Sequence, residues 1–268
     1  LRAVQPGASV KAILLGCGTS GGVPRIGNDW GECDPANPRN CRTRVSVIIE
    51  HDAQRILVDT SPDLRHQLLR EQIGELDAVI WTHDHADHTH GIDDLRALFH
   101  RTRRPIAGYA KDYTLQSLIT RFDYVFEGGD GYPATVSAAA LGDEQAICGL
   151  TVRTVDQPHG PVLSTGLRFD LQGRSIVYAT DFSHFTDEMV ALYAGCDLLI
   201  TDCLRHEKHP THASLPMALG LAEQCGARHT VLTHMDKTLD YAALCLELPE
   251  GVEPGYDGLV VDLDRIAP

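Results

Sequence analysis

A dense cluster of metal-binding side-chain types constrains this chain more than any other feature. Residues 82–88 read Thr-His-Asp-His-Ala-Asp-His, a His-x-His-x-Asp-His spacing. The apolar run directly before it, residues 76–81, is typical of a buried strand, so the cluster is expected in the loop at a strand end. Imidazole and carboxylate groups are ligands for borderline divalent metals. We expect the first two histidines to point to one side of the loop and Asp87 and His88 to reach another, so that the loop can supply two ions.

This spacing resembles the signature loop of the metallo-β-lactamase-fold hydrolases. Those enzymes take further ligands from a later histidine, a later aspartate and a last histidine, each after a strand. The chain has candidates in that order, namely His159, Asp181 and His234, and the first of them follows the strand-like residues 150–155. The resemblance implies an α/β fold, a four-layer αβ/βα sandwich with its metals at one edge. Because candidates from both halves must meet at one site, we expect a single domain over residues 1–268.

The resemblance also implies how the ligands are shared between two divalent ions. His83, His85 and His159 would hold one ion, Asp87, His88 and His234 the other, and Asp181 would bridge them. Asp59, which follows the strand-like residues 54–58, would orient the metal-binding loop by hydrogen bonding. A hydroxide bridging the ions would act as the nucleophile. We expect Asp87 to be a catalytic residue as well as a ligand. The ligand set suits Zn²⁺, Mn²⁺ and Fe²⁺ alike, and we expect two ions of Zn²⁺ or Mn²⁺.

A second group of histidines lies at positions 206, 209 and 212. In phosphodiesterase and RNA-processing relatives, a histidine just before a helix that starts with Ser or Thr serves as general acid or phosphate contact. His212, which precedes Ala213 and Ser214, matches that place, so the resemblance implies that it is the catalytic acid. His209 is the reserve candidate and a tentative substrate-binding residue. A plain surface position accounts best for His206.

A glycine-rich segment, residues 16–24, follows the strand-like residues 11–15. Its glycines allow the backbone to pass close to a ligand. From the residues alone, a plain turn is an equally good interpretation. Phosphodiesterase and RNA-processing relatives carry a similar glycine-rich loop beside their metals.

The charge of the chain bears on its substrate. A formal net charge of −14 argues against a nucleic-acid polymer, because phosphate contacts along a polymer need a high density of Lys and Arg. The Gly-Pro-rich arm of transfer-RNA-processing relatives is also missing from the sequence. A small phosphate ester or nucleotide remains compatible, because two divalent cations reverse the local sign of the charge.

The cysteines and the apolar patterning bear on localisation. Most of the eight cysteines lie among apolar residues without paired spacing, as reduced thiols do. The sequence contains no apolar run near 18 residues, and residues 1–7 lack an apolar signal core. We therefore expect a cytoplasmic protein without a membrane association.

These observations favour a dinuclear phosphodiesterase that hydrolyses a small phosphate ester, such as a cyclic ribosyl phosphate or a nucleotide. The branch that the chain most resembles is that of the phosphoribosyl cyclic phosphodiesterases. A thioester or other carboxylic-derivative hydrolase is the second hypothesis, and a metal-bearing binding protein without turnover is the third. Hydrolysis of β-lactams is disfavoured, because Thr180 and Asp181 are not accompanied by the cysteine of the lactam-cleaving enzymes. The oligomeric state stays open, a homodimer included.

Overall fold

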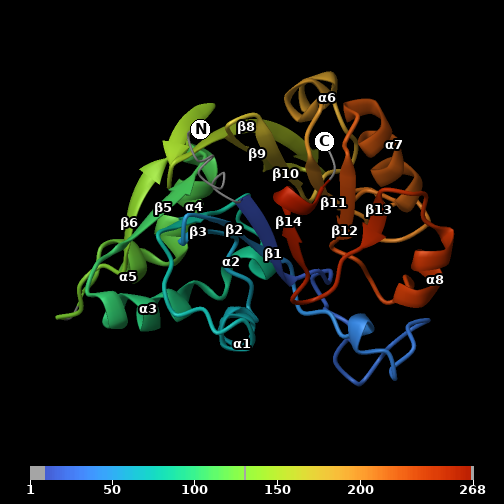
Figure 1. The fold of residues 1–268 in the computed structure, drawn as a ribbon. Coiled ribbons are helices and arrows are strands. Elements are labelled where there is room, and N and C mark those ends of the chain that lie inside the picture. Colours follow the sequence, from blue (N-terminus) through green and yellow to red (C-terminus); the bar gives the residue numbers. More distant parts are fainter. Residues whose placement is uncertain (1–9, 130, 267–268) are drawn as a thin grey trace, which may run out of the picture.

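Two sheets of seven strands form the centre of the described chain (Figure 1). The computed structural model describes residues 10–129 and 131–266. In spatial order, the first sheet contains β14 (Val260–Asp262), β1 (Val10–Gly16), β2 (Ser46–His51), β3 (Gln54–Val58), β4 (Ala78–Ile80), β5 (Ile106–Ala110) and β6 (Val136–Ala140). The second contains β13 (Val252–Pro254), β12 (His229–Thr233), β11 (Leu198–Asp202), β10 (Arg174–Ala179), β9 (Val162–Leu171), β8 (Leu150–His159) and β7 (Glu144–Ile147).

The two sheets repeat one pairing pattern. In the first sheet, β14, β1, β2 and β3 pair antiparallel, whereas β3, β4, β5 and β6 pair parallel. In the second sheet, β7 to β10 pair antiparallel and β10 to β13 pair parallel. The carboxyl ends of parallel strands meet at one edge of a sheet, and ligands of open α/β sheets bind outside such ends. The parallel halves therefore provide the edge at which loop side chains can meet.

Helices cover the outer faces of the two sheets (Figure 1). The helices of the first half are α1 (Leu64–Arg70), α2 (Ala86–Thr89), α3 (Leu95–Thr102), α4 (Asp112–Arg121) and α5 (Asp123–Phe126). Those of the second half are α6 (Asp187–Tyr193), α7 (Leu215–Cys225) and α8 (Tyr241–Glu247). Three short 3₁₀ turns lie at Pro38–Asn40, Ile92–Asp94 and Leu263–Arg265.

Alternating side chains along the strands build the layers. In β3, Ile56 and Val58 enter the core between the two sheets, while Leu57 faces the helices of the first half. In β10, Tyr178 enters the core between the sheets and Val177 packs against α6 and α7. Because central strands such as β3 and β10 bury both of their faces, the sheets lie between two helical layers. The expected α/β four-layer sandwich is confirmed.

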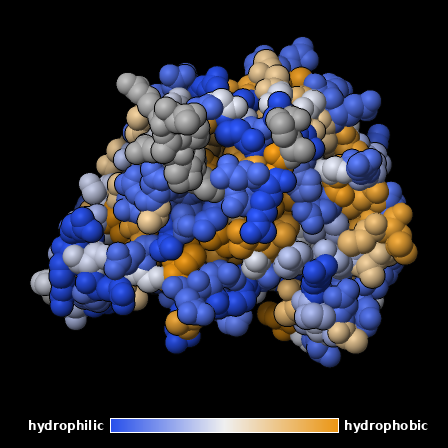
Figure 2. Space-filling view, in the orientation of Figure 1, coloured by the Kyte–Doolittle hydropathy of each residue, from blue (hydrophilic) through white to orange (hydrophobic). Residues whose placement is uncertain are grey.

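The described surface is mainly polar. Figure 2 shows mainly hydrophilic residues over the face seen in Figure 1, with hydrophobic patches between them. Among the helices of residues 10–129 and 131–266, none combines the length and apolar character that a bilayer crossing requires. The eight cysteines are all unpaired thiols. Residues 1–7, which lack a signal-like core in the sequence, lie outside the described residues.

Candidate metal centre

The fold brings all seven candidate ligands to the edge where the parallel strands end. Three overlapping groups form, and within each group the potential ligand atoms lie within 4.8 Å of one another; the third, Asp181, His212 and His234, shares members with the other two. The first group consists of His83, His85, His159 and Asp181. The second consists of Asp87, His88 and His234. The division between the two sides of the loop is the one that the sequence spacing predicts.

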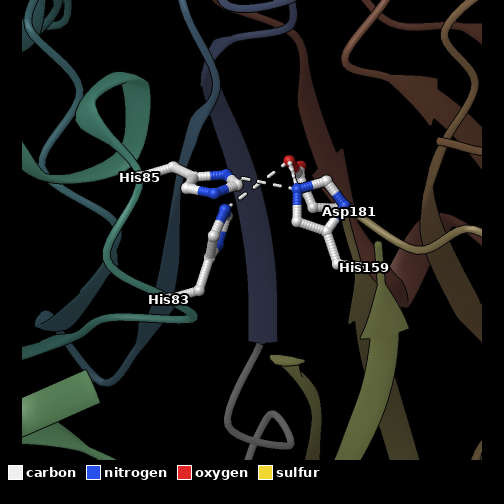
Figure 3. Close-up of side chains that lie close together, drawn as sticks. All are labelled: His83, His85, His159 and Asp181. Atoms are coloured by element: carbon white, nitrogen blue, oxygen red, sulfur yellow. Dashed lines mark hydrogen bonds and ion pairs between the residues drawn. The ribbon is translucent and has the colours of Figure 1, made fainter. Parts of the chain in front are cut away.

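Asp181 lies between the two groups and turns one carboxylate oxygen to each. Its Oδ2 is 3.7 Å from His83 Nε2 and 3.4 Å from His159 Nε2. Its Oδ1 is 3.3 Å from His88 Nε2 and 3.6 Å from His234 Nε2. Figure 3 shows His83 and His85 facing Asp181 and His159 across the first group. This is the arrangement that a carboxylate bridging two cations requires.

Three strand ends at the centre adopt a left-handed backbone without glycine. Asp59, Asp181 and His234 have φ values of 63°, 60° and 58°. They follow β3 of the first sheet and β10 and β12 of the second, where β11 lies between β10 and β12. Non-glycine residues adopt this region at a cost of roughly 1–3 kcal/mol and are concentrated at functional sites. The turn aims each side chain back across the strand end into the cluster.

The buried nitrogens of the cluster fit a metal ion. Within the described residues, His83 Nε2, His88 Nε2 and His234 Nε2 are buried and have no hydrogen-bond partner. An unsatisfied buried polar atom lowers the stability of the fold by roughly 1–3 kcal/mol. Three such nitrogens aimed at one carboxylate therefore favour a cation bound between them. Imidazole and carboxylate are the donors that Zn²⁺ and Mn²⁺ accept. The residues therefore fit divalent ions in both groups.

The protonation of the cluster also suits cation binding. His88 is fully buried, yet Asp181, Asp87 and Asp59 outweigh that burial and raise its pKa well above the usual value. Burial and the neighbouring positive charge of His88 lower the pKa of His83 well below its usual value. The pKa of Asp181 is held well below its ordinary range, because His234, His88 and His212 outweigh its burial. A bound divalent cation would compete with a proton for the His88 ring nitrogen.

Asp59 holds the metal-binding loop from the inside. Its Oδ1 accepts a hydrogen bond from Thr82 N at 2.8 Å, and its Oδ2 accepts one from Thr82 Oγ1 at 2.8 Å. His88 Nδ1 donates to Oδ2 at 2.7 Å, which directs His88 Nε2 toward Asp181. Because Asp59 is fully buried, these bonds are shielded from water. The arrangement is the one expected for a residue that orients metal ligands.

His212 lies next to the cluster and is held by a carboxylate that sequence reasoning missed. Its Nδ1 is 3.1 Å from Asp202 Oδ2 and 3.8 Å from Asp181 Oδ2. The ring stacks on that of His234 with centroids 4.5 Å apart. Although burial lowers the pKa of His212, Asp202 and Asp181 raise it to about 9. Asp202 is the last residue of β11, and Asp181 follows the end of β10. This position at the end of a strand is the sequence signal that could have identified Asp202.

The other loop histidines are less closely connected. The ring of His209 is 5.3 Å from that of His212, and His209 Nδ1 accepts a hydrogen bond from Thr211 N at 3.3 Å. His206 is exposed and pairs with Glu247 on α8 at 3.0 Å. His209 therefore lies at the rim of the cluster, and His206 occupies a surface position.

The glycine-rich segment passes close to the centre. Thr19 N donates to the carbonyl of Met235, the residue after His234, at 3.1 Å. A Cβ on Gly18 would lie 2.8 Å from the carbonyl oxygen of Arg42, so the backbone approach at this position requires glycine. The segment lies against the chain that carries His234.

A cavity of about 490 Å³ lies elsewhere, between α3, α5 and the following loop. Phe99, Tyr124 and Tyr132 are among its lining residues, and none of the candidate ligands is. We therefore identify the candidate site by its donor atoms and charge rather than by cavity size.

Comparison with known sequences agrees with this geometry. The sequence model described as a β-lactamase superfamily domain matches residues 54–235, well over half of the chain. A Porphyromonas gingivalis protein named octanoyltransferase is 35% identical over 263 residues, which are 96% of this chain and 52% of that protein. The chain thus spans about half the length of this relative.

Solved structures extend the comparison. A diphosphatase of the PhnP family shares 35% sequence identity at a TM-score of 0.86, with 95% of this chain and 97% of that chain covered. Zn²⁺-bound PqqB from Methylobacterium extorquens shares 20% identity at a TM-score of 0.74, with 94% and 99% covered, a likeness of fold alone. The matched domain, the fold and the His/Asp cluster lead to one conclusion: the chain belongs to the β-lactamase superfamily and is a metal-dependent hydrolase with the metallo-β-lactamase fold.

Proposed function

We propose that the chain is a dinuclear phosphodiesterase that hydrolyses a small phosphate ester, either a cyclic ribosyl phosphate or a nucleotide. The observation that carries the proposal is the division of Asp181, whose two oxygens face two separate sets of imidazole nitrogens, and three of these nitrogens are buried without a hydrogen-bond partner. Two cations bridged by one carboxylate suit a substrate that develops negative charge on several oxygens at once, as a phosphoryl group does.

The proposed ligands divide by side of the loop. His83 Nε2, His85 Nδ1, His159 Nε2 and Asp181 Oδ2 would hold one ion. Asp87 Oδ2, His88 Nε2, His234 Nε2 and Asp181 Oδ1 would hold the other. When bound, divalent ions supply Lewis-acid polarisation of a phosphoryl oxygen and a water of lowered pKa. Either Zn²⁺ or Mn²⁺ accepts this donor set.

His212 is the proposed general acid. Its Nδ1 faces the buried Asp202, so Nδ1–H donates to that carboxylate and Nε2 is left to exchange a proton with the substrate. Phe182 N and Ala213 N also donate to Asp202 Oδ2, at 3.3 Å and 3.2 Å, which fixes the carboxylate itself. A ribose alkoxide is a poor leaving group at neutral pH. A histidine held beside the reacting phosphate can protonate it as the bond breaks.

The net charge of the chain and its similarity to a solved relative support the proposed substrate class. The net charge of −14 opposes binding of a long polyanion, and the 35% identical solved relative is named as a diphosphatase. Both point to a compact phosphate substrate held mainly by the two ions. The octanoyltransferase name belongs to a protein about twice as long as the matched region, so an acyl substrate serves as a comparison in the test.

A turnover screen of the metal-loaded protein tests the proposal. The panel contains a cyclic ribosyl phosphate, bis(p-nitrophenyl) phosphate, a nucleoside diphosphate, p-nitrophenyl phosphate, an octanoyl thioester, a β-lactam and a structured transfer RNA precursor. We expect the highest kcat/KM on a small cyclic phosphate or nucleotide. Faster hydrolysis of the thioester or the lactam, or efficient RNA cleavage without small-ester turnover, would overturn the proposal.

Two variants control the screen. Asp181→Asn keeps the size of the side chain but loses its charge, and we expect roughly 10²- to 10³-fold lower kcat, the scale for an electrostatic group at a reacting centre. Asp143→Asn removes an exposed carboxylate that pairs with Lys111 on the surface, and we expect unchanged kcat. Equal kcat in wild type and Asp181→Asn would place the reaction elsewhere.

A further inference from the structure

Helix α4 holds the outer side of the metal-binding loop. Ser117 Oγ donates to Asp84 Oδ2 at 2.5 Å, and Arg121 Nη1 donates to the backbone carbonyl of Asp84. Arg121 Nη1 also lies 3.4 Å from Asp84 Oδ2, and Nη2 lies 2.9 Å from His90 Nε2. Asp84 is the residue between His83 and His85, so these bonds act directly between two proposed ligands of one ion.

The positions of the two α4 residues suit this contact. Residues four apart lie on one face of a helix, so Ser117 and Arg121 both reach the loop. Other residues of the helix, Leu115 and Leu118, are buried in the core between the first sheet and its helices. The two polar side chains therefore project from a packed and rigid element. Supporting groups on such elements hold a site more accurately than groups on loops do.

Hydrogen bonds on the inner side of the metal-binding loop involve residues of the motif other than Asp84. Asp59 binds Thr82 and His88, at the two ends of the motif. His85 is exposed, whereas His83 and His88 are buried, so surrounding core packing does least to fix His85. The carbonyl that Arg121 binds belongs to the peptide group that precedes His85. Fixing this peptide restricts the direction in which the His85 ring leaves the backbone.

We propose that Ser117 and Arg121 are positioning residues that preorganise His83 and His85 for the first metal ion. A planar guanidinium suits the task, because its nitrogens reach Asp84 and His90 together, which a single ammonium group cannot do. The charge of Arg121 is balanced locally by the Asp84 carboxylate. The inference rests on the proposed function only in requiring that the cluster bind two ions.

Metal affinity, measured without substrate, tests the inference. Zn²⁺ dissociation constants are determined by competition with a chromophoric chelator, in the full chain and in the background His234→Ala, which disables the second site. In that background, Arg121→Met should weaken binding of the remaining ion roughly 10- to 100-fold, the usual effect of losing a group that orients a ligand. Ser117→Ala should have a smaller effect, and Arg121→Lys an intermediate one.

Controls separate positioning from general damage. Arg101→Met removes an exposed arginine of α3 that pairs with Glu75, and it should leave Zn²⁺ affinity unchanged. In the complementary background His159→Ala, which disables the first site, Arg121→Met should change affinity less than twofold. Equal losses in both backgrounds would overturn the inference. Unchanged affinity together with a raised KM would also overturn it and make Arg121 a substrate contact. A chain that shows the expected affinities but hydrolyses no phosphate ester would refute the proposed function and leave this inference standing.

Discussion

Replacement of His212 by alanine should separate substrates by their leaving group. The side chain lies beside the cluster, with Nδ1 bound to Asp202 and its ring stacked on His234, but it is not among the seven proposed ligands. His212→Ala should therefore keep both metal ions and lose proton donation. A positioned acid contributes roughly 10²- to 10⁴-fold in rate, or about 3–5 kcal/mol of barrier, to departure of an alkoxide.

Asp202 supplies a second, graded perturbation. The bond between Asp202 and His212 spans 3.1 Å inside a buried environment, and hydrogen bonds to charged groups contribute roughly 1.5–3 kcal/mol. If the full free energy of this hydrogen bond stabilises the transition state, Asp202→Asn should lower kcat by about 10- to 150-fold. This loss is smaller than that of His212→Ala, because the imidazole remains.

The assay compares kcat/KM on an alkyl or ribosyl diester with that on a p-nitrophenyl diester, whose phenolate leaves without protonation. The loss in His212→Ala should be confined largely to the first substrate. His206→Ala, which removes an exposed histidine paired with Glu247, should change neither. Equal losses on both substrates would refute the acid role and make His212 a phosphate contact. Loss of a metal ion would make it a ligand, and unchanged rates would direct the search to His209.

Two further predictions concern metal binding and the stability of the fold. Asp59→Asn should weaken Zn²⁺ binding roughly 10- to 100-fold, because His88 and Thr82 lose the carboxylate that orients them. Competition with a chelator measures the Zn²⁺ dissociation constant, and an unchanged constant would contradict this role of Asp59. Gly91→Ala places a Cβ 1.9 Å from the carbonyl oxygen of Ser61 and should lower the free energy of unfolding by roughly 1–3 kcal/mol in urea titrations. Gly142→Ala, whose Cβ would meet its nearest atom at 3.8 Å, is the matched control, and equal destabilisation of both variants would refute the steric argument.

Much of the centre could be predicted because its chemistry is local in sequence. The residues from His83 to His88 carry ligand types at fixed spacing after an apolar run, and the later candidates each stand near the end of a strand-like segment. The structure differs in detail at His159. This residue was expected in a loop after a strand over residues 150–155, but β8 continues through it, because His159 still pairs with Val162 across the hairpin.

The missing parts depend on contacts between distant segments. Asp202 reads in the sequence as one more aspartate at a strand end, and only its pairing with His212 gives it a role. Ser117 and Arg121 follow Asp84 by 33 and 37 residues, and no local pattern connects them. The left-handed backbone at Asp59, Asp181 and His234 is equally hidden, because glycine is the usual sequence signal for that conformation.

Anomalous diffraction from crystals loaded with Zn²⁺ tests the central claim most directly, since that claim is the division of Asp181 between two ions. The account predicts two peaks, one among His83, His85 and His159 and the other among Asp87, His88 and His234. Each ion should lie about 2.0–2.2 Å from its own oxygen of Asp181. A single peak at full metal load, or two ions on the same Asp181 oxygen, would contradict it.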